Sequence, residues 1–304
     1  MFGEYLYVSS ASRTLLDHFE ALADTVVRRE ELAKGEAVMD IGSNDGSLLA
    51  AFARRGMRVL GIDPARNLAA LARERGVETE TVFFGAATAA RIRSARGPAR
   101  VLTATNSLPH IPALDDYFAG VRTLLAPDGV FVAEAHYLAD VDGQSAFDTI
   151  YHEHVSYWVT EAVDAAARRA LARGISRRAA PVHHGQLRVW VAHRGARTTE
   201  ASVRDVLAEE RRLRLHDIAT WRAFARRAQA VREGLRGASR AEAPRTAHRR
   251  VRRRLQGDDA AGVARARSGM DRVHCRPESV EAGALHARHT YSDCRAGADR
   301  RRST

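Results

Sequence analysis

The chain has 304 residues, of which 45% are hydrophobic and 28% charged, values that are typical of a soluble globular protein. It carries no apolar run long enough to cross a bilayer and no N-terminal signal-peptide pattern, so we expect a cytoplasmic protein without a membrane partner. The two cysteines, Cys275 and Cys294, lie near the end, which excludes a disulfide framework or a Cys-rich zinc site in the body of the protein.

The net charge of +11 raises the question of a nucleic-acid partner. Residues 240–304 contain 16 arginines and 8 acidic residues, so +8 of this charge belongs to the tail and the body is nearly neutral. The tail also lacks interleaved aromatic side chains apart from Tyr291. We therefore expect no nucleic-acid partner, and a basic protein that binds nucleic acid remains the non-enzymatic alternative.

The first half of the chain predicts a helix and then strands that alternate with helices. In the helix, Leu15, Phe19 and Val26 fall on one face, and a serine such as Ser12 can cap its start. The predicted strands are "EAVMDIG", "RVLGIDPA", "ARVLTATNSL" and "VFVAEAHYL", and the helices between them are "SLLAAFARRG", "NLAALARERG" and "LDDYFAGVRTLLAPDG". This alternation specifies a parallel sheet with helices on both faces.

The second half predicts a helix in "EAVDAAARRALARG", a strand in "GQLRVWVAHR" and one or two long polar-faced helices after residue 199. The periodicity stops after about residue 238. We expect residues 238–304 to form a disordered, Arg-rich tail.

A nucleoside site is predicted by the stretch "VMDIGSNDGSLL", which lies at a strand-to-helix turn. Gly42 and Gly46 let the backbone approach a ligand, and Asp63, at the end of the next strand, can accept hydrogen bonds from two ribose hydroxyls. A dinucleotide fingerprint would need glycine in place of Asn44 and Ser47. A nicotinamide-dependent Rossmann oxidoreductase is therefore the alternative rather than the favoured interpretation.

Asp40 and the D-x-G-x-x-x-G spacing resemble motif I of class I S-adenosylmethionine-dependent methyltransferases. We predict S-adenosylmethionine as the cofactor. Asn106 and His110 follow the strand in "ARVLTATNSL" and face the donor or acceptor, although a lone histidine such as His110 is more often structural. Phe83 and Phe84 fit an adenine wall and the core equally well. The expected cofactor-binding residues are Asp40, Gly42, Asn44, Gly46, Asp63 and Asn106.

The stretch "FDTIYHEHVSYW" is the second candidate site and has three interpretations: a metal site, an acid–base site or the polar edge of a loop. His152 and His154 stand two apart, which suits a metal on a strand, but no further ligand recurs nearby, so no metal is expected. An acid–base site needs only a base and a group that orients it. The stretch follows "VFVAEAHYL", so the topology can return it to the cofactor edge; Tyr151 and Tyr157 fit simple packing as well.

Four stretches together are similar to the sugar C-methyltransferases, which methylate C-3 of nucleotide-linked 4-keto deoxysugars: "DIGSNDGSLL", "GIDPA", "FDTIYHEHVSY" and "PVHHGQLRVWV". The resemblance covers about residues 1–237. It implies that His154 removes the C-3 proton, which the adjacent ketone acidifies, and that the enolate takes the methyl group of S-adenosylmethionine. It further implies catalytic roles for Tyr151 and Glu153 and substrate binding by Tyr7 (rather than Tyr5), His152 and His183.

The resemblance implies an α/β fold, a class I methyltransferase (Rossmann-like) parallel sheet, with an incomplete C-terminal α/β lobe. A nucleotide sugar is the implied substrate partner, and we expect a monomer or weak dimer. The expected organisation is a helical segment bordering the active site (1–30), the S-adenosylmethionine-binding domain (31–160), a remnant of the substrate lobe (161–237) and the tail (238–304).

The chain departs from this family at both ends. It starts just after the place of the family's Cys-rich zinc module, and the Arg-rich tail takes the place of a second nucleotide-fold-like lobe. Read one base later, residues 251–262 permit "YGAASKATTLL" and residues 286–294 permit "MPGTHIPI", two strings similar to motifs of that lobe. We predict that the tail is a frameshift product, that the break lies between about residues 234 and 245, and that activity is weak or absent even where the donor binds.

Overall fold

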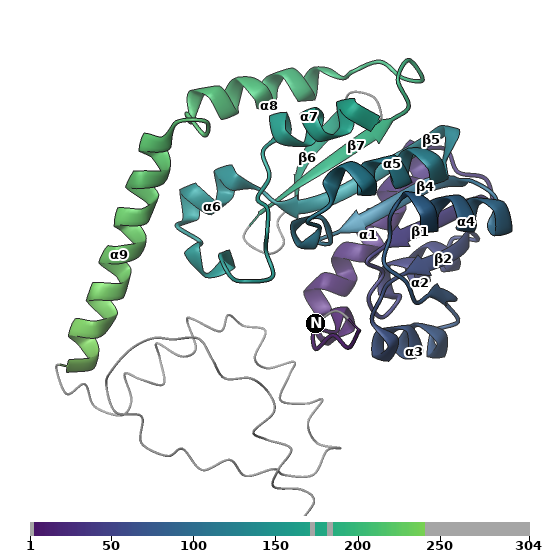
Figure 1. Ribbon diagram of the computed structural model, residues 1–304, viewed down its shortest axis with the longest axis horizontal. Coiled ribbons are helices and arrows are strands. Elements are labelled where there is room, and N and C mark those ends of the chain that lie inside the picture. The colour runs from purple at the N-terminus through teal and green to yellow at the C-terminus, as the bar shows by residue number, and fades with distance from the viewer. Residues whose placement is uncertain (1–2, 171–173, 181–184, 241–304) are drawn as a thin grey trace, which may run out of the picture. The chain divides into compact units, whose positions relative to one another are not determined.

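The structure, a computed structural model, describes residues 3–170, 174–180 and 185–240. Its central feature is a seven-stranded sheet of order β3-β2-β1-β4-β5-β7-β6 (Figure 1). Among the described strands, β7 alone runs in the opposite direction to the others, so its pairings with β5 and β6 are antiparallel. The strands are β1 (Ala37–Ile41), β2 (Arg58–Ile62), β3 (Thr79–Glu80), β4 (Ala99–Thr105), β5 (Leu125–His136), β6 (Gly174–Ala180) and β7 (Gln186–Ala192).

Helices follow most of the strands. The α-helices are α1 (Arg13–Arg29), α2 (Ser47–Arg54), α3 (Arg66–Glu74), α4 (Ala86–Arg96), α5 (Leu114–Leu124), α6 (Leu138–Gln144), α7 (Thr160–Ala170), α8 (Ala201–Arg212) and α9 (Ile218–Arg240). Three 3-10 turns are η1 (Ser9–Ala11), η2 (Leu108–His110) and η3 (Phe147–Thr149). Among the described helices, none combines the length and the apolar character needed to cross a membrane.

The sheet separates two hydrophobic cores because successive side chains of a strand point to opposite faces. In β1, Val38 packs with α1 and α2, whereas Met39 packs with α4 and α5. The same alternation recurs at Val101 and Leu102 of β4. The expected parallel sheet with helices on both faces is confirmed.

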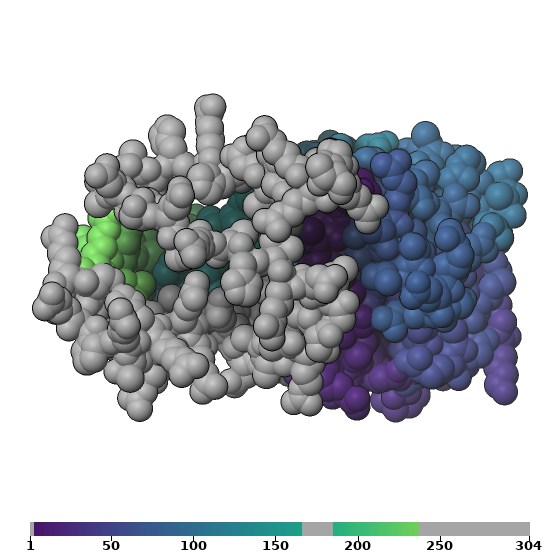
Figure 2. Space-filling view, turned by 90° about the horizontal axis from the view of Figure 1, so that it is seen from below, coloured from purple at the N-terminus to yellow at the C-terminus, as the bar shows by residue number. Residues whose placement is uncertain are grey.

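Helix α1 forms as its sequence predicts. The Ser12 hydroxyl accepts a hydrogen bond from the Leu15 backbone N–H at 3.3 Å, which satisfies one of the free donors of the first turn. Leu15, Phe19 and Val26 are buried on the face that meets α2. In the space-filling view, the purple N-terminal residues adjoin the blue residues that follow β1 (Figure 2).

Strand β5 differs from its predicted extent at both ends. It begins at Leu125 rather than at "VFVAEAHYL", because Leu125 is buried and pairs with Ala99 ahead of a register irregularity. It ends at His136, where Tyr137 caps the start of α6. The long helical region predicted after residue 199 is two helices, α8 and α9.

Strands β6 and β7 continue the same sheet, since β7 pairs with β5 from Val130↔Ala192 to His136↔Gln186. The residues after β7 include α8, whose Glu210 accepts a hydrogen bond from the Thr160 N–H at 2.7 Å. The tail was predicted to begin at residue 238, but helix α9 continues to Arg240. Residues 241–304 of that tail, with Cys275 and Cys294, and the predicted substrate residue His183 lie outside the described residues.

Candidate active site

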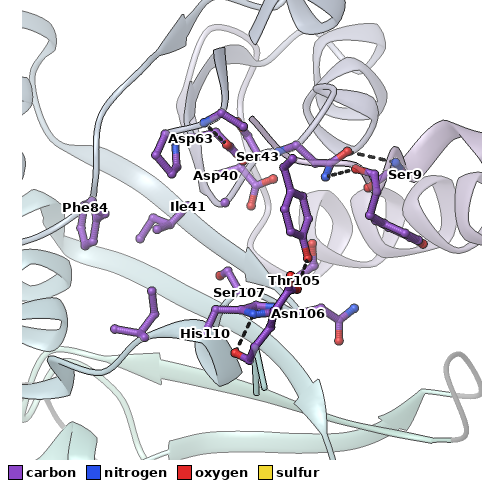
Figure 3. A pocket seen from close by; sticks show the side chains of 18 of the residues that line it. Ser9, Asp40, Ile41, Ser43, Asp63, Phe84, Thr105, Asn106, Ser107 and His110 are labelled. Carbon is purple, nitrogen blue, oxygen red and sulfur yellow. Dashed lines mark hydrogen bonds between the residues drawn. The ribbon is translucent and has the colours of Figure 1, made fainter. Parts of the chain in front are cut away.

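A cavity of about 810 Å³ lies where the parallel strands β1, β2 and β4 end. One wall carries Asp40 and Asp63, and another carries Asn106 and His110 (Figure 3). The carboxyl ends of parallel strands are the usual ligand-binding edge of an open α/β sheet. Asp148, Thr149, Tyr151, Glu153 and His154, which belong to the predicted acid–base stretch, line the same cavity.

The loop after β1 follows a path that its glycines permit. Gly42 and Gly46 have φ angles of 79° and 73°, in the left-handed region that side chains disfavour. A Cβ atom added to Gly42 would stand 2.6 Å from Cβ of Ser107, so the loop meets the end of β4 at a distance that only glycine allows. Asn44 also has a positive φ, 51°.

Asp63 is held by two backbone N–H groups. The Asn44 N–H donates to its Oδ2 at 2.9 Å, and the Ala65 N–H donates to its Oδ1 at 2.8 Å. Burial raises the pKa of Asp63, while these two hydrogen bonds lower it. Each carboxylate oxygen keeps a further lone pair, so Asp63 is able to accept hydrogen bonds from a ribose diol.

Asp40 lies at the buried side of the cavity. The Thr103 hydroxyl donates to its Oδ1 at 2.7 Å. Burial raises the pKa of Asp40 to about 6, and the Thr103 hydrogen bond lowers it. Asp40 is therefore mostly ionised at pH 7, and its charge favours a cationic ligand group over an anionic one.

Asn106 is fixed on the opposite wall by two partners. It has a φ of 56°, its backbone N–H donates to the Glu134 carbonyl at 2.8 Å, and its Oδ1 accepts a hydrogen bond from Gln186 Nε2 at 2.7 Å. Its side chain thus connects the cavity to β7. Sequence analysis had no signal for Gln186, which comes from a strand eighty residues away.

The geometry around His154 defines which of its ring nitrogens is a base. Nδ1 lies 2.8 Å from the Thr149 carbonyl, which can only accept, so Nδ1 carries the proton. Nε2 is then the acceptor in the neutral ring, and the Tyr151 hydroxyl donates to it at 2.9 Å. Burial lowers the pKa of His154, whereas the Thr149 hydrogen bond and Glu153 raise it, so the neutral ring predominates at pH 7.

Other histidine and tyrosine side chains surround His154. The rings of His110 and His136 have their centroids 5.0 Å from that of His154. His110 Nδ1 donates to the Glu153 carbonyl at 3.0 Å, and the Tyr5 hydroxyl donates to Glu153 Oε2 at 3.2 Å. Sequence analysis gave little weight to His110 and preferred Tyr7 to Tyr5. Both tyrosines line the cavity.

Most of the predicted site residues meet in this one cavity. Its lining includes Asp40, Gly42, Asn44, Asp63, Asn106, Tyr7, Tyr151, Glu153 and His154. Gly46 shapes the loop without lining the cavity. His152 also falls outside the lining. It occupies a turn, and its side chain lies beside the Glu153 carboxylate and is 71% exposed. Phe84 lines the cavity and packs on Tyr117, so it serves both wall and core.

A buried polar network behind the cavity was missed by sequence analysis. His18 of α1 lies 2.8 Å from Glu134 Oε2, and Arg188 of β7 donates to Glu134 Oε1 at 2.5 Å. Burial raises the pKa of Glu134, but its two partners outweigh burial and hold that pKa below its usual range. Side chains alternate between the two faces of β5, and this alternation puts Glu134 on a buried face. That pattern was the signal in the sequence that could have identified Glu134. Among the residues that the structure describes, no group of three or more His, Cys, Asp or Glu side chains is arranged to hold a metal ion.

S-adenosylmethionine fits the donor end of this cavity on chemical grounds. Asp63 presents carboxylate lone pairs for a ribose, the glycine loop allows close backbone approach, and Ile41 and Phe84 provide apolar surface for an adenine ring. The carboxylate of Asp40 complements the positive charge of a sulfonium group.

Comparisons with known proteins find two matching family models and a curated relative. The family model of the methyltransferase domain matches residues 15–170, and that of the C-methyltransferase C-terminal domain matches residues 181–265. The curated protein C-methyltransferase NovU of Streptomyces niveus is 38% identical over 237 residues, which cover 78% of this chain and 56% of that protein. The chain thus spans about half the length of this relative.

Two solved structures are similar to this chain at low sequence identity. The PH0226 protein of Pyrococcus horikoshii OT3 is 16% identical, with a TM-score of 0.46 over 62% of this chain and 95% of its own. An S-adenosylmethionine-dependent methyltransferase of Clostridium acetobutylicum ATCC 824 is 10% identical, with a TM-score of 0.46 over 59% and 92%. The residues matched by the family model and the order of the strands in the sheet show that the chain belongs to the methyltransferase domain family, with the class I fold. The methyl donor is S-adenosylmethionine.

Proposed function

We propose that this chain is a C-methyltransferase that methylates C-3 of a nucleotide-linked 4-keto deoxysugar, with His154 as the base. The observation that carries the proposal is the pairing of a neutral His154, whose Nε2 is an acceptor, with a donor loop in the same cavity. The relation to a curated protein named a C-methyltransferase supports transfer to carbon.

Transfer to carbon requires removal of a proton from that carbon. In a 4-keto sugar the ketone acidifies the C-3 proton, and a neutral imidazole is a suitable base near pH 7. His154 Nε2 accepts this proton, and the Thr149 carbonyl stabilises the resulting imidazolium through Nδ1–H. Among the described residues, the Tyr157 hydroxyl also donates to the Thr149 carbonyl, at 3.3 Å.

Tyr151 supplies a second part of this chemistry. Before proton transfer its hydroxyl donates to His154 Nε2. Once Nε2 is protonated it becomes a donor, so the Tyr151 oxygen accepts and its own O–H is released to donate to the enolate oxygen. Burial raises the pKa of Tyr151, which keeps the phenol protonated for this role.

On the donor side, bound S-adenosylmethionine supplies an electrophilic methyl group. Asp63 holds the ribose, and the Gly42 turn lets the backbone lie close to the donor. Glu153 and Tyr5, which are hydrogen-bonded to each other, orient the sugar beside His154. The proton taken from C-3 leaves from His154 to solvent, which balances the replacement of hydrogen by methyl.

The test is methyl transfer from isotope-labelled S-adenosylmethionine to a nucleotide-linked 4-keto-6-deoxysugar, with the methylated carbon located by NMR. Label at C-3 is the expected result. Label on oxygen or nitrogen, or tight binding of a nicotinamide dinucleotide together with hydride transfer, contradicts the proposal and favours the oxidoreductase alternative.

A further inference from the structure

Residues 3–12, here named the strap, cross the donor side of the cavity before α1 begins. One end of the strap is paired with Asn67 in the first turn of α3. The Tyr5 N–H donates to Asn67 Oδ1 at 3.0 Å, and Asn67 Nδ2 donates to the Tyr5 carbonyl at 2.8 Å. The side-chain amide thereby satisfies both backbone groups of one residue, as a neighbouring β-strand would.

The other end of the strap has the same kind of attachment. Asn44 Nδ2 donates to the Tyr7 carbonyl at 3.0 Å, and Asn44 Oδ1 accepts from the Ser9 N–H at 2.9 Å. Figure 3 shows Ser9 beside the donor loop, with dashed lines for these bonds. The Ser10 N–H adds a bond of 3.1 Å to Asp45 Oδ2. Two asparagine clamps therefore hold the strap, Asn67 at Tyr5 and Asn44 at Tyr7 and Ser9.

The clamped tyrosines belong to the acceptor side. Tyr5 and Tyr7 are two residues apart in the strap, on the part that the two asparagine side chains hold. Both line the cavity, and the Tyr5 hydroxyl reaches Glu153 Oε2 at 3.2 Å. Through this bond Tyr5 contacts the carboxylate of Glu153, the neighbour in sequence of the proposed base, His154.

Asn44 is the point at which the two sides meet. Its backbone N–H donates to Asp63 Oδ2, the carboxylate expected to hold the ribose, while its side chain holds the strap. Asn67, in contrast, does not line the cavity and is exposed. Its bonds to Tyr5 give it an effect on the acceptor side without a contact to the donor.

We propose that Asn44 and Asn67 are positioning residues, which clamp the strap so that Tyr5 holds Glu153 beside the base, and that Asn44 couples this arrangement to the donor loop. The inference rests on the proposed function. It adds two residues, one of them outside the cavity, that act through Tyr5 and Glu153 rather than on the substrate.

The test centres on Asn67, with Arg66→Ala as the matched control because the Arg66 side chain is exposed on the same helical turn. Asn67→Ala should lower kcat/KM for the sugar by about tenfold, as expected from the loss of two hydrogen bonds, and change the Kd for S-adenosylmethionine by less than about twofold. Hydrogen–deuterium exchange should show faster exchange of the strap amides in this variant. Arg66→Ala should match the wild type in all three measurements.

Asn67→Asp separates positioning from folding. It keeps an acceptor for the Tyr5 N–H, removes the donor to the Tyr5 carbonyl, and places a carboxylate at a helix N-terminus, where it is stabilising. We expect an undiminished melting temperature together with an intermediate loss of kcat/KM. A loss of kcat/KM that follows the melting temperature across the variants would overturn the positioning role.

The exchange measurement also keeps the inference separate from the proposed function. If the wild type transfers no methyl group to the sugar, the proposed function fails, yet strap exchange still decides whether the clamps exist. Strap amides that exchange equally in wild type and Asn67→Ala overturn the inference, whatever the activity.

Discussion

The donor and acceptor sides of the cavity are built in different ways. The donor side comes from one continuous region, with Asp40, Gly42 and Asp63 at the ends of the adjacent strands β1 and β2. The acceptor side joins segments far apart in sequence, since Tyr5 and Glu153 are separated by 148 residues. Backbone and sheet register fix the first side, whereas side-chain contacts fix the second. Substitutions should therefore separate donor binding from catalysis.

The largest separation is expected for His154→Gln. The amide keeps a similar size but cannot accept the proton at neutral pH, so methyl transfer should fall by about 10²–10⁴-fold. The described hydrogen bonds of His154 go to Thr149 and Tyr151 rather than to residues 42–46 of the loop after β1, so the Kd for S-adenosylmethionine should stay within about twofold. Radiolabel transfer and calorimetry measure the two effects. Equal losses in both would mean that the two sides are not independent.

Asp63→Ala should weaken donor binding strongly and lower kcat little, which is the opposite of the result expected for His154→Gln. Loss of hydrogen bonds from the ribose to a charged group costs about 1.5–3 kcal/mol, or roughly 10–150-fold in Kd. At saturating donor, kcat should fall much less than this. Asp17→Ala, on the exposed face of α1, is a control of the same chemistry. Calorimetry that finds the same Kd in wild type and Asp63→Ala removes Asp63 from the donor site.

Tyr151→Phe tests the acceptor side through its pH dependence. The Tyr151 oxygen can accept from Nε2–H of protonated His154 in a charge-assisted bond that stabilises the imidazolium, so its removal should lower the pKa of His154. The activity of a base rises with pH through its pKa. The acidic limb of the kcat/KM profile should therefore move to lower pH, with about a tenfold loss on the plateau. An acidic limb that does not move would show that Tyr151 makes no such bond.

The smallest effect is expected for His152→Gln. This histidine was predicted to bind substrate, but its side chain is exposed and outside the cavity lining. The kcat/KM of His152→Gln should stay within about twofold of the wild type, although His152 lies only two positions from His154, where the largest effect is expected. An increase in KM of tenfold or more would return His152 to the substrate site and imply that the turn closes over the sugar.

The same contrast explains which features could be predicted from the sequence. Gly42, Asp63 and the strand ends are encoded locally, by a turn that only glycine allows and by buried runs, and the structure brings them together as expected. Tyr5 and Gln186 could not be predicted, because their partners lie far away in sequence and no local pattern specifies such contacts. His110 stood in a predicted loop, but a single histidine carries no signal of its neighbours.

The extent of the sheet was also less predictable than its core. Strand β5 starts early because Leu125 pairs with Ala99, a contact that is set by the neighbouring strand rather than by the sequence of β5. Strand β6 has a polar, Arg-containing sequence without the alternation that reveals a strand, and its pairing with β7 defines it. The frameshift origin of the tail stays a prediction, which the coding DNA across residues 234–245 tests.

Exchange of the sugar C-3 proton with solvent tests the central claim most directly, because it isolates proton removal by His154 from methyl transfer. The protein is incubated in deuterated water with the nucleotide-linked 4-keto sugar and S-adenosylhomocysteine, and loss of the C-3 proton signal is followed by NMR. The account predicts exchange with wild type, and loss of exchange by at least about 10²-fold with His154→Gln at unchanged donor affinity. Exchange at the wild-type rate in His154→Gln would contradict it.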